Sequence, residues 1–194
     1  MIKVGLTGGI GAGKSIVARI LESCNYPVFN SDQVAKKLIV EDQSLRSELI
    51  HEFGDSVYKG TEPDRTFLAG VIFKDETARE KINSLVHPRV RKSFADFCEN
   101  TKSPLVFNEA AILFETGSYN QFNKNILVTA PESLRIDRVM ERDGLSRSAV
   151  EDRIKAQWSD ESKAQLADFV IVNDEVQPLL TQVEAILEEL TKLQ

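Results

Sequence analysis

The chain has 194 residues, 42% of them hydrophobic and 28% charged, which is enough to bury one sizeable core with a smaller subdomain attached. Its formal net charge of −6 argues against a dedicated nucleic-acid binder, because binding a phosphate backbone requires an excess of lysine and arginine. No apolar run resembles a signal peptide or is long enough to span a bilayer, so we expect a cytoplasmic protein without a membrane partner. Cys24 and Cys98 are far apart in sequence and are expected to be reduced thiols, not a disulfide or a zinc site.

The first predicted elements are a strand, a glycine-rich loop and a helix. Residues 2–7 form a short β-branched run typical of a buried parallel strand, and apolar residues recur at helical spacing over residues 14–24. A second strand is predicted over residues 26–30, and Ser31 and Asp32 are residue types that begin a helix. This order of strand, helix and strand indicates a doubly wound α/β fold.

The middle of the chain has a different character. From about residue 33 to residue 100 the sequence is charged and helical, with breaks predicted near residues 53–64 and at Pro88. A helical insertion between strands is often where a kinase-like fold holds its second substrate.

Strand patterns return in the last part of the chain, over residues 104–115, 125–130 and 168–173. Helices are predicted from Pro131, from Ser146 through about Trp158, and over residues 176–193.

Residues 8–15, GGIGAGKS, fit the phosphate-loop pattern G-x-x-x-x-G-K-[ST]. Its glycines let successive backbone N–H groups surround a phosphate, and the following helix adds the positive end of its dipole. Lys14 can reach the β- and γ-phosphates, and the Ser15 hydroxyl can ligate Mg²⁺. The position between a predicted strand and a predicted helix favours this reading over a chance glycine-rich turn. The predicted nucleotide-binding residues are Gly9, Gly11, Ala12, Gly13, Lys14, Ser15 and Ile16.

The loop does not name the group that receives the phosphate. A GTPase would also carry an Asn-Lys-x-Asp segment, and the nearest match, Asn123-Lys124-Asn125, lacks the aspartate. A motor ATPase or helicase is normally longer and more basic. Small size and a helical insertion favour a kinase that acts on a small metabolite.

Asp32 follows the second predicted strand, so it is expected at the edge of the sheet where the phosphate loop lies. A carboxylate there can accept the proton of an attacking hydroxyl and align it. The alternative is an acid that caps the helix or lies in its first turn. Position alone does not decide between the two.

Basic residues gather in two further places, and both allow a structural reading. His87, Pro88 and the basic residues after them suit an anionic substrate or, equally, a proline-set helix start with a solvated basic face. Arg135, Arg138 and Arg142 are spaced three and four apart, so they can share one helix face and serve a lid over transferring phosphates. The alternative is a salt-bridged surface. Glu109 closes a predicted strand, so it could be the acid that orients Mg²⁺ through water, or a loop acid with no role. The roles of Arg91 and Arg153 stay open.

The ordered set of motifs resembles dephospho-coenzyme A kinases over nearly the whole chain. The phosphate loop is generic, whereas the order of the other segments is specific to that family. The matching segments are VGLTGGIGAGKS, Asp32, HPRVR (87–91), ILFETG (112–117), RVMERDGLS (138–146), RIKAQ (153–157) and ADFVIVN (167–173).

The resemblance implies a three-layer P-loop NTPase fold of the α/β class, with a central parallel sheet, a helical substrate-binding insertion and a small helical lid. It implies transfer of phosphate from ATP, with Mg²⁺, to the 3′-hydroxyl of dephospho-CoA, giving CoA and ADP in the last step of CoA synthesis. The implied nucleotide-binding core comprises residues 1–32, 103–137 and 160–194, the CoA-binding region residues 33–102, and the lid residues 138–159.

By the same resemblance, catalytic roles fall to Lys14, Asp32, Arg138 and Arg142. Contacts with the acceptor fall to Asp32, His87, Arg89 and Glu115, and Asn173 is expected near the adenine of ATP. Other hypotheses remain: a different small P-loop kinase acting on a nucleoside or nucleotide, or a nucleotide-gated binding module without catalysis.

Four positions depart from the pattern common in the family. Asn30 stands where an aspartate is usual, Ile16 replaces a threonine, Ala111 replaces a proline, and Glu175 stands where a glycine is common. Since Asp32 is retained, the departure at Asn30 alters a supporting contact and leaves the expected catalysis in place.

Overall fold

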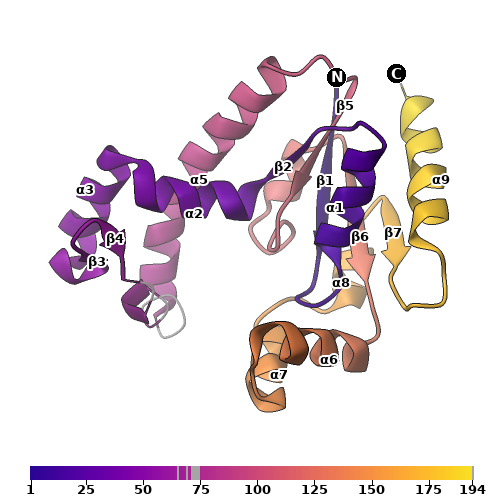
Figure 1. Ribbon diagram of the computed structural model, residues 1–194. Helices are drawn as coiled ribbons and strands as arrows, with labels where there is room; N and C mark the ends of the chain where they lie inside the picture. Colours follow the sequence, from indigo (N-terminus) through magenta and orange to yellow (C-terminus); the bar gives the residue numbers. More distant parts are fainter. Residues whose placement is uncertain (65, 69, 71–74, 194) are drawn as a thin grey trace. The chain divides into compact units, whose positions relative to one another are not determined.

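The computed structural model describes residues 1–64, 66–68, 70 and 75–193. Contacts between residues divide the chain into two units, one made of Met1–Asn30 with Thr101–Gln194 and the other of Ser31–Asn100 (Figure 1). Within the described residues, no helix is both long enough and apolar enough to cross a membrane.

The first unit is built on a parallel sheet of five strands in the order β2-β5-β1-β6-β7 (Figure 1). The strands are short and rich in β-branched and aromatic residues, and Val4, Phe107 and Leu127 are completely buried. A parallel sheet carries the carboxyl ends of its strands to one edge, and Leu6 of β1 is in register with Glu109 of β5 there. The strands are β1 (Ile2–Gly8), β2 (Val28–Asn30), β5 (Leu105–Glu109), β6 (Lys124–Thr129) and β7 (Phe169–Val172).

Helices flank this sheet, which confirms the predicted α/β class. Helices α1 and α9 pack together, α1 against β1 and β5 and α9 against β7, while α8 contacts β6 and lies behind it in Figure 1. Apolar residues from α1, α9 and the strands form one core. The α-helices are α1 (Lys14–Ser23), α6 (Glu132–Asp143), α7 (Arg147–Lys155), α8 (Asp160–Ala164) and α9 (Leu179–Thr191), with a 3₁₀ helix η2 (Ser118–Gln121).

The second unit is mostly helical. Helix α2 packs against α3 and α5, and the Tyr58 hydroxyl ties the hairpin to α2 by donating to the carbonyl of Ile39, at 2.7 Å. Its elements are α2 (Ser31–Glu41), α3 (Gln43–Phe53), the 3₁₀ helix η1 (Asp55–Val57), the antiparallel pair β3 (Tyr58–Lys59) and β4 (Glu62–Pro63), and α5 (Glu76–Glu99).

The predicted helix break at Pro88 is wrong, because α5 runs through it. A proline inside a helix leaves one carbonyl without its backbone partner, here that of Ser84. Both Pro88 and Ser84 lie on the exposed face, so water can satisfy that carbonyl. On the other face Ile82, Val86 and Val90 are buried, and this apolar stripe keeps the helix continuous.

Other boundaries differ from the prediction, and several short elements were not predicted. The strand predicted to residue 115 ends at Glu109, since residues 111–117 form turns. The closing helix begins at Leu179, after Pro178, and not at residue 176. The short helix α8 and the two-residue strands of the hairpin were not predicted, because elements so short carry no measurable periodicity.

Candidate active site

The phosphate loop connects β1 to α1 and is held in a conformation that needs glycine. Gly11 and Gly13 have φ of 79° and 95°, in the left-handed region, and Gly13 lies just before the first turn of α1. A Cβ atom added to Gly13 would lie 2.1 Å from the side-chain nitrogen of Asn173. The amide of Ala12 donates to the carbonyl of Gly9 at 3.1 Å and closes the turn. The loop therefore presents the amino end of a helix, with its positive dipole, to a phosphate.

The two polar side chains at the start of α1 face the sheet edge. Lys14 Nζ donates to the carbonyl of Gly8 at 2.7 Å, which folds the lysine back over its own loop. The Ser15 hydroxyl donates to Glu109 Oε1 at 2.9 Å, and Glu109 Oε2 accepts from Asn30 Nδ2 at 2.7 Å. Glu109 ends β5 and is 5% exposed. Three neighbouring segments thus bring a hydroxyl and a carboxylate together, and oxygen ligands of this kind suit Mg²⁺.

Two predicted site residues support the loop from behind. Asn173, only 5% exposed, donates from Nδ2 to the carbonyl of Ala12 at 2.9 Å. Arg138 donates to the Asn173 carbonyl at 3.2 Å and to Glu175 Oε1 at 3.0 Å. Glu175 has φ of 66°, which explains why glycine suits this position. Asn173 was predicted near adenine, and its side chain here holds the loop backbone.

Arg142, the other predicted lid arginine, is paired with its sequence neighbour. Its Nε and Nη2 donate to the two carboxylate oxygens of Asp143, at 2.7 and 2.9 Å, and its side chain is 63% exposed. This pairing raises the pKa of Arg142 and lowers that of Asp143. Arg135, although on the same helix, is buried, so the three arginines do not form one open basic face.

The residues predicted to meet the acceptor from the second unit lie on two helices. Asp32 is exposed in the first turn of α2. His87 is half-buried in the middle of α5, where burial, and then the charge of Arg91, lowers its pKa. The imidazole is therefore neutral at pH 7 and can donate or accept a hydrogen bond without carrying charge.

Arg89 is already bound within the second unit. Its guanidinium contacts Glu48 at 2.7 Å and Asp42 at 3.3 Å, and it donates to the Ser44 hydroxyl at 3.2 Å. The hydrogen bond with Glu48 raises the pKa of Arg89 and lowers that of Glu48. The structural reading of a proline-set helix start with a solvated basic face is wrong at this residue, because Pro88 lies inside α5 and Arg89 is paired with two carboxylates.

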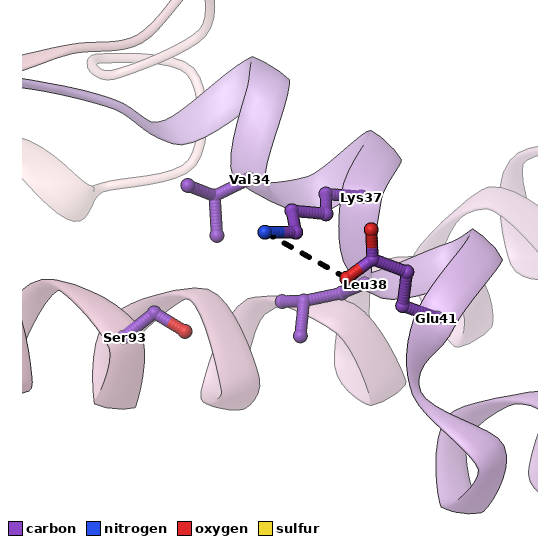
Figure 2. Close-up of a pocket in the computed structure, with 5 residues that line it drawn as sticks. All are labelled: Val34, Lys37, Leu38, Glu41 and Ser93. Carbon is purple, nitrogen blue, oxygen red and sulfur yellow. Dashed lines mark ion pairs between the residues drawn. The ribbon is translucent and has the colours of Figure 1, made fainter.

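A pocket of about 320 Å³ lies between α2 and α5 (Figure 2). Lys37 and Glu41 pair at 3.7 Å at its rim, and both are well exposed. The lining residues are Val34, Lys37, Leu38, Glu41 and Ser93, and they include no predicted acceptor contact.

Glu115, the remaining predicted acceptor contact, belongs to a buried charged cluster in the first unit. Its Oε1 lies 2.8 Å from the Nζ of Lys163, which is fully buried, and accepts from the amide of Trp158 at 3.3 Å. Asp160, one turn from Lys163, pairs with Arg135 at 3.1 Å. Burial raises the pKa of Asp160, and the charges of Arg135 and Lys163 partly offset that rise.

Asp160 and Lys163 were not predicted from the sequence, because α8 itself was not predicted. No group of three or more His, Cys, Asp or Glu side chains suited to a metal occurs among the residues that the structure describes.

Comparison with known proteins identifies the family. Residues 2–178 match the family model described as dephospho-CoA kinase. A dephospho-CoA kinase of Bacteroides fragilis is 38% identical over 183 residues, covering 94% of this chain and 89% of that protein.

Solved structures agree with this match. A Thermus thermophilus crystal structure superposes with a TM-score of 0.86 at 36% identity, covering 100% of this chain and 98% of the other. The dephospho-CoA kinase of Campylobacter jejuni gives a TM-score of 0.67 at 26% identity, covering 98% and 97%. The chain belongs to the dephospho-CoA kinase family.

Proposed function

We propose that the chain transfers the γ-phosphoryl group of ATP to the 3′-hydroxyl of dephospho-CoA, giving CoA and ADP in the last step of CoA biosynthesis. The observation that carries the proposal is the family match over residues 2–178. The phosphate loop supports the donor half independently, since Gly11 and Gly13 have the backbone conformation that phosphate binding requires. A cytoplasmic location, with ATP available, is part of the same proposal.

On the donor side, the loop amides and Lys14 hold the phosphates of ATP. Ser15 and Glu109 would hold Mg²⁺, the serine directly and the carboxylate through water. A bound Mg²⁺ neutralises charge on the β- and γ-phosphate oxygens. Because the Ser15 hydroxyl donates its proton to Glu109, its lone pairs remain available to the ion. Gly9, Ala12 and Ile16 complete the nucleotide site in this proposal.

On the acceptor side, Asp32 orients the 3′-hydroxyl and accepts its proton as the new O–P bond forms. His87 and Glu115 contact the acceptor, His87 as a neutral group. Arg89 provides a cation, although part of its charge is already balanced by Glu48 and Asp42. The CoA-binding region is the helical segment of residues 33–102.

Arg138 and Arg142 stabilise the charge that develops on the transferring group, as lid residues within 138–159. Arg142 is held by Asp143 in this structure, so its action requires it to exchange that partner for a phosphate oxygen. The remaining segments, residues 1–32, 103–137 and 160–194, form the nucleotide-binding core.

A screen of acceptors tests the proposal directly. ADP release is followed with dephospho-CoA, nucleosides and nucleoside monophosphates as separate acceptors, and the product is analysed for phosphate at the 3′ position. Release that depends on dephospho-CoA and yields the 3′-phosphorylated product is the expected result. Turnover with a nucleoside monophosphate and none with dephospho-CoA would favour another small P-loop kinase.

A further inference from the structure

Ile10, in the first half of the phosphate loop, is held on three sides by other parts of the chain. Its amide donates to Gln157 Oε1 at 2.8 Å, and its carbonyl accepts from Arg135 Nε at 2.9 Å. Its side chain packs against the apolar cluster of α6 and α7, which includes Val139 and Val150. Both peptide bonds that flank this residue are thereby fixed by side chains distant in sequence.

Arg135 also packs directly against the two glycines that flank Ile10. A Cβ atom at Gly9 would lie 2.2 Å from Arg135 Nη2, and one at Gly11 would lie 2.5 Å from the Arg135 carbonyl. The loop backbone therefore rests directly on this residue, and the contact requires glycine at positions 9 and 11. Gly11 is also required by its φ of 79°. Arg135 is 6% exposed, and its guanidinium pairs with Asp160 Oδ2 at 3.1 Å.

We propose that Arg135 is a positioning residue that holds residues 9–11 of the phosphate loop in the shape that binds nucleotide phosphates, and that Asp160 holds Arg135 in place. The proposal rests on the proposed function only in requiring a nucleotide at this loop, and it does not depend on the acceptor. The physical reason is preorganisation. A glycine-rich segment has many accessible conformations, and ordering it before the ligand arrives lowers the entropic cost of binding.

A purely structural role for the same ion pair makes a different prediction. A buried arginine that loses its carboxylate destabilises the fold whether or not it shapes a ligand site. Such a role would lower the melting temperature and leave nucleotide affinity in the folded protein unchanged. A positioning role would weaken binding of the phosphates and leave the KM for dephospho-CoA almost unchanged.

The experiment compares Arg135→Lys, Arg135→Gln and Asp160→Asn with Lys124→Met as a matched control. Lys124 pairs with Asp168 at 2.8 Å across the amino-terminal ends of β6 and β7, at the opposite edge of the sheet from the phosphate loop. For each full-length variant, the Kd for ADP is measured by calorimetry below its melting temperature. The KM values for ATP and dephospho-CoA are measured under the same conditions.

We expect Arg135→Gln to raise the Kd for ADP by about 10- to 100-fold, as loss of a charge-assisted hydrogen bond predicts. Arg135→Lys should partly rescue affinity, and Asp160→Asn should weaken binding in the same direction, because Asp160 pairs with the Arg135 guanidinium. Lys124→Met should lower the melting temperature without changing the Kd.

If the folded Arg135→Lys and Asp160→Asn proteins bind ADP within about twofold of wild type, the positioning role is wrong. These two variants decide the matter even if Arg135→Gln does not fold. Wild-type turnover with dephospho-CoA, measured alongside, tests the proposed function separately. A wild-type protein that binds ADP but does not use dephospho-CoA would overturn the function and leave the role of Arg135 open to the same measurement.

Discussion

Replacing Glu109 by Gln should weaken the binding of Mg²⁺ during the reaction with little change in the fold. Glutamine has nearly the same shape, so its amide oxygen can still accept from Asn30 Nδ2, as Glu109 Oε2 does at 2.7 Å. The amide nitrogen then faces Ser15, whose hydroxyl has to accept where it formerly donated, at 2.9 Å. The reversed hydrogen bond occupies a lone pair of Ser15. The substitution itself removes a negative charge from the proposed Mg²⁺ site.

The magnitude follows from these two losses. Changing a group that supports a metal ligand typically costs 10- to 100-fold in metal affinity. Loss of one buried hydrogen bond to a charged group costs about 1.5–3 kcal/mol, part of which the reversed bond restores. We therefore expect the apparent Mg²⁺ constant to rise by about 10- to 100-fold while the unfolding free energy falls by about 1 kcal/mol.

The assay is ADP release at saturating ATP and acceptor over a titration of Mg²⁺, with unfolding measured in urea. Ser15→Ala and the double variant supply the control, because the part of the Glu109 effect that acts through the Ser15 hydroxyl should disappear once that hydroxyl is gone. An apparent Mg²⁺ constant within about twofold of wild type would refute the reasoning, as would full additivity of the two changes.

Three further outcomes are expected. Asp32→Asn should abolish detectable turnover and leave the Kd for ADP unchanged, since Asp32 is proposed to act on the acceptor. An equal loss of turnover and of ADP affinity would contradict that role. Retained turnover would exclude Asp32 as the base. His87→Gln should remove part of the pH dependence of the unfolding free energy. Burial lowers the pKa of His87 below 6.5 in the folded state, so the unfolded state binds more protons than the folded state as the pH falls through 6.5. The wild-type protein therefore loses stability in that pH range. Urea unfolding at pH 7.5 and 5.5 should therefore show a smaller loss for the variant, and equal losses would refute the assignment. Pro88→Ala should raise the unfolding free energy by about 1–3 kcal/mol, because the alanine amide can donate to the carbonyl of Ser84; no gain in a urea titration would show that this carbonyl cannot be reached.

The features predictable from sequence were those that a contiguous segment specifies. The phosphate loop lies within residues 8–15, and its glycines, lysine and serine each have a local backbone or chemical requirement. The strands are contiguous apolar runs, so the parallel sheet could also be predicted from the sequence. The helix break predicted at Pro88 was wrong because the low helix propensity of proline was considered without the buried apolar residues that keep α5 continuous.

The contacts that hold the loop could not be predicted, because they join residues more than a hundred positions apart. Arg135 lies in α6 and Gln157 follows α7, and both reach Ile10 only in the folded chain. Three arginines at helical spacing indicated one basic face, yet Arg135 is buried and Arg142 is exposed. Residue spacing predicts the face of a helix on which a residue lies, but it does not predict which residues on that face are buried by neighbouring elements.

The departure at Asn30 illustrates how one substitution changes the charge balance of the site. An aspartate at this position, common in the family, would bring a second carboxylate toward Glu109, whereas Asn30 donates a hydrogen bond to it. Two carboxylates so close repel each other unless a proton or a cation lies between them. With asparagine, Glu109 is satisfied by Asn30 and Ser15 before any ion binds. In the role proposed for Glu109, the carboxylate that supports Mg²⁺ is thus oriented in advance, with one negative charge fewer to attract the ion.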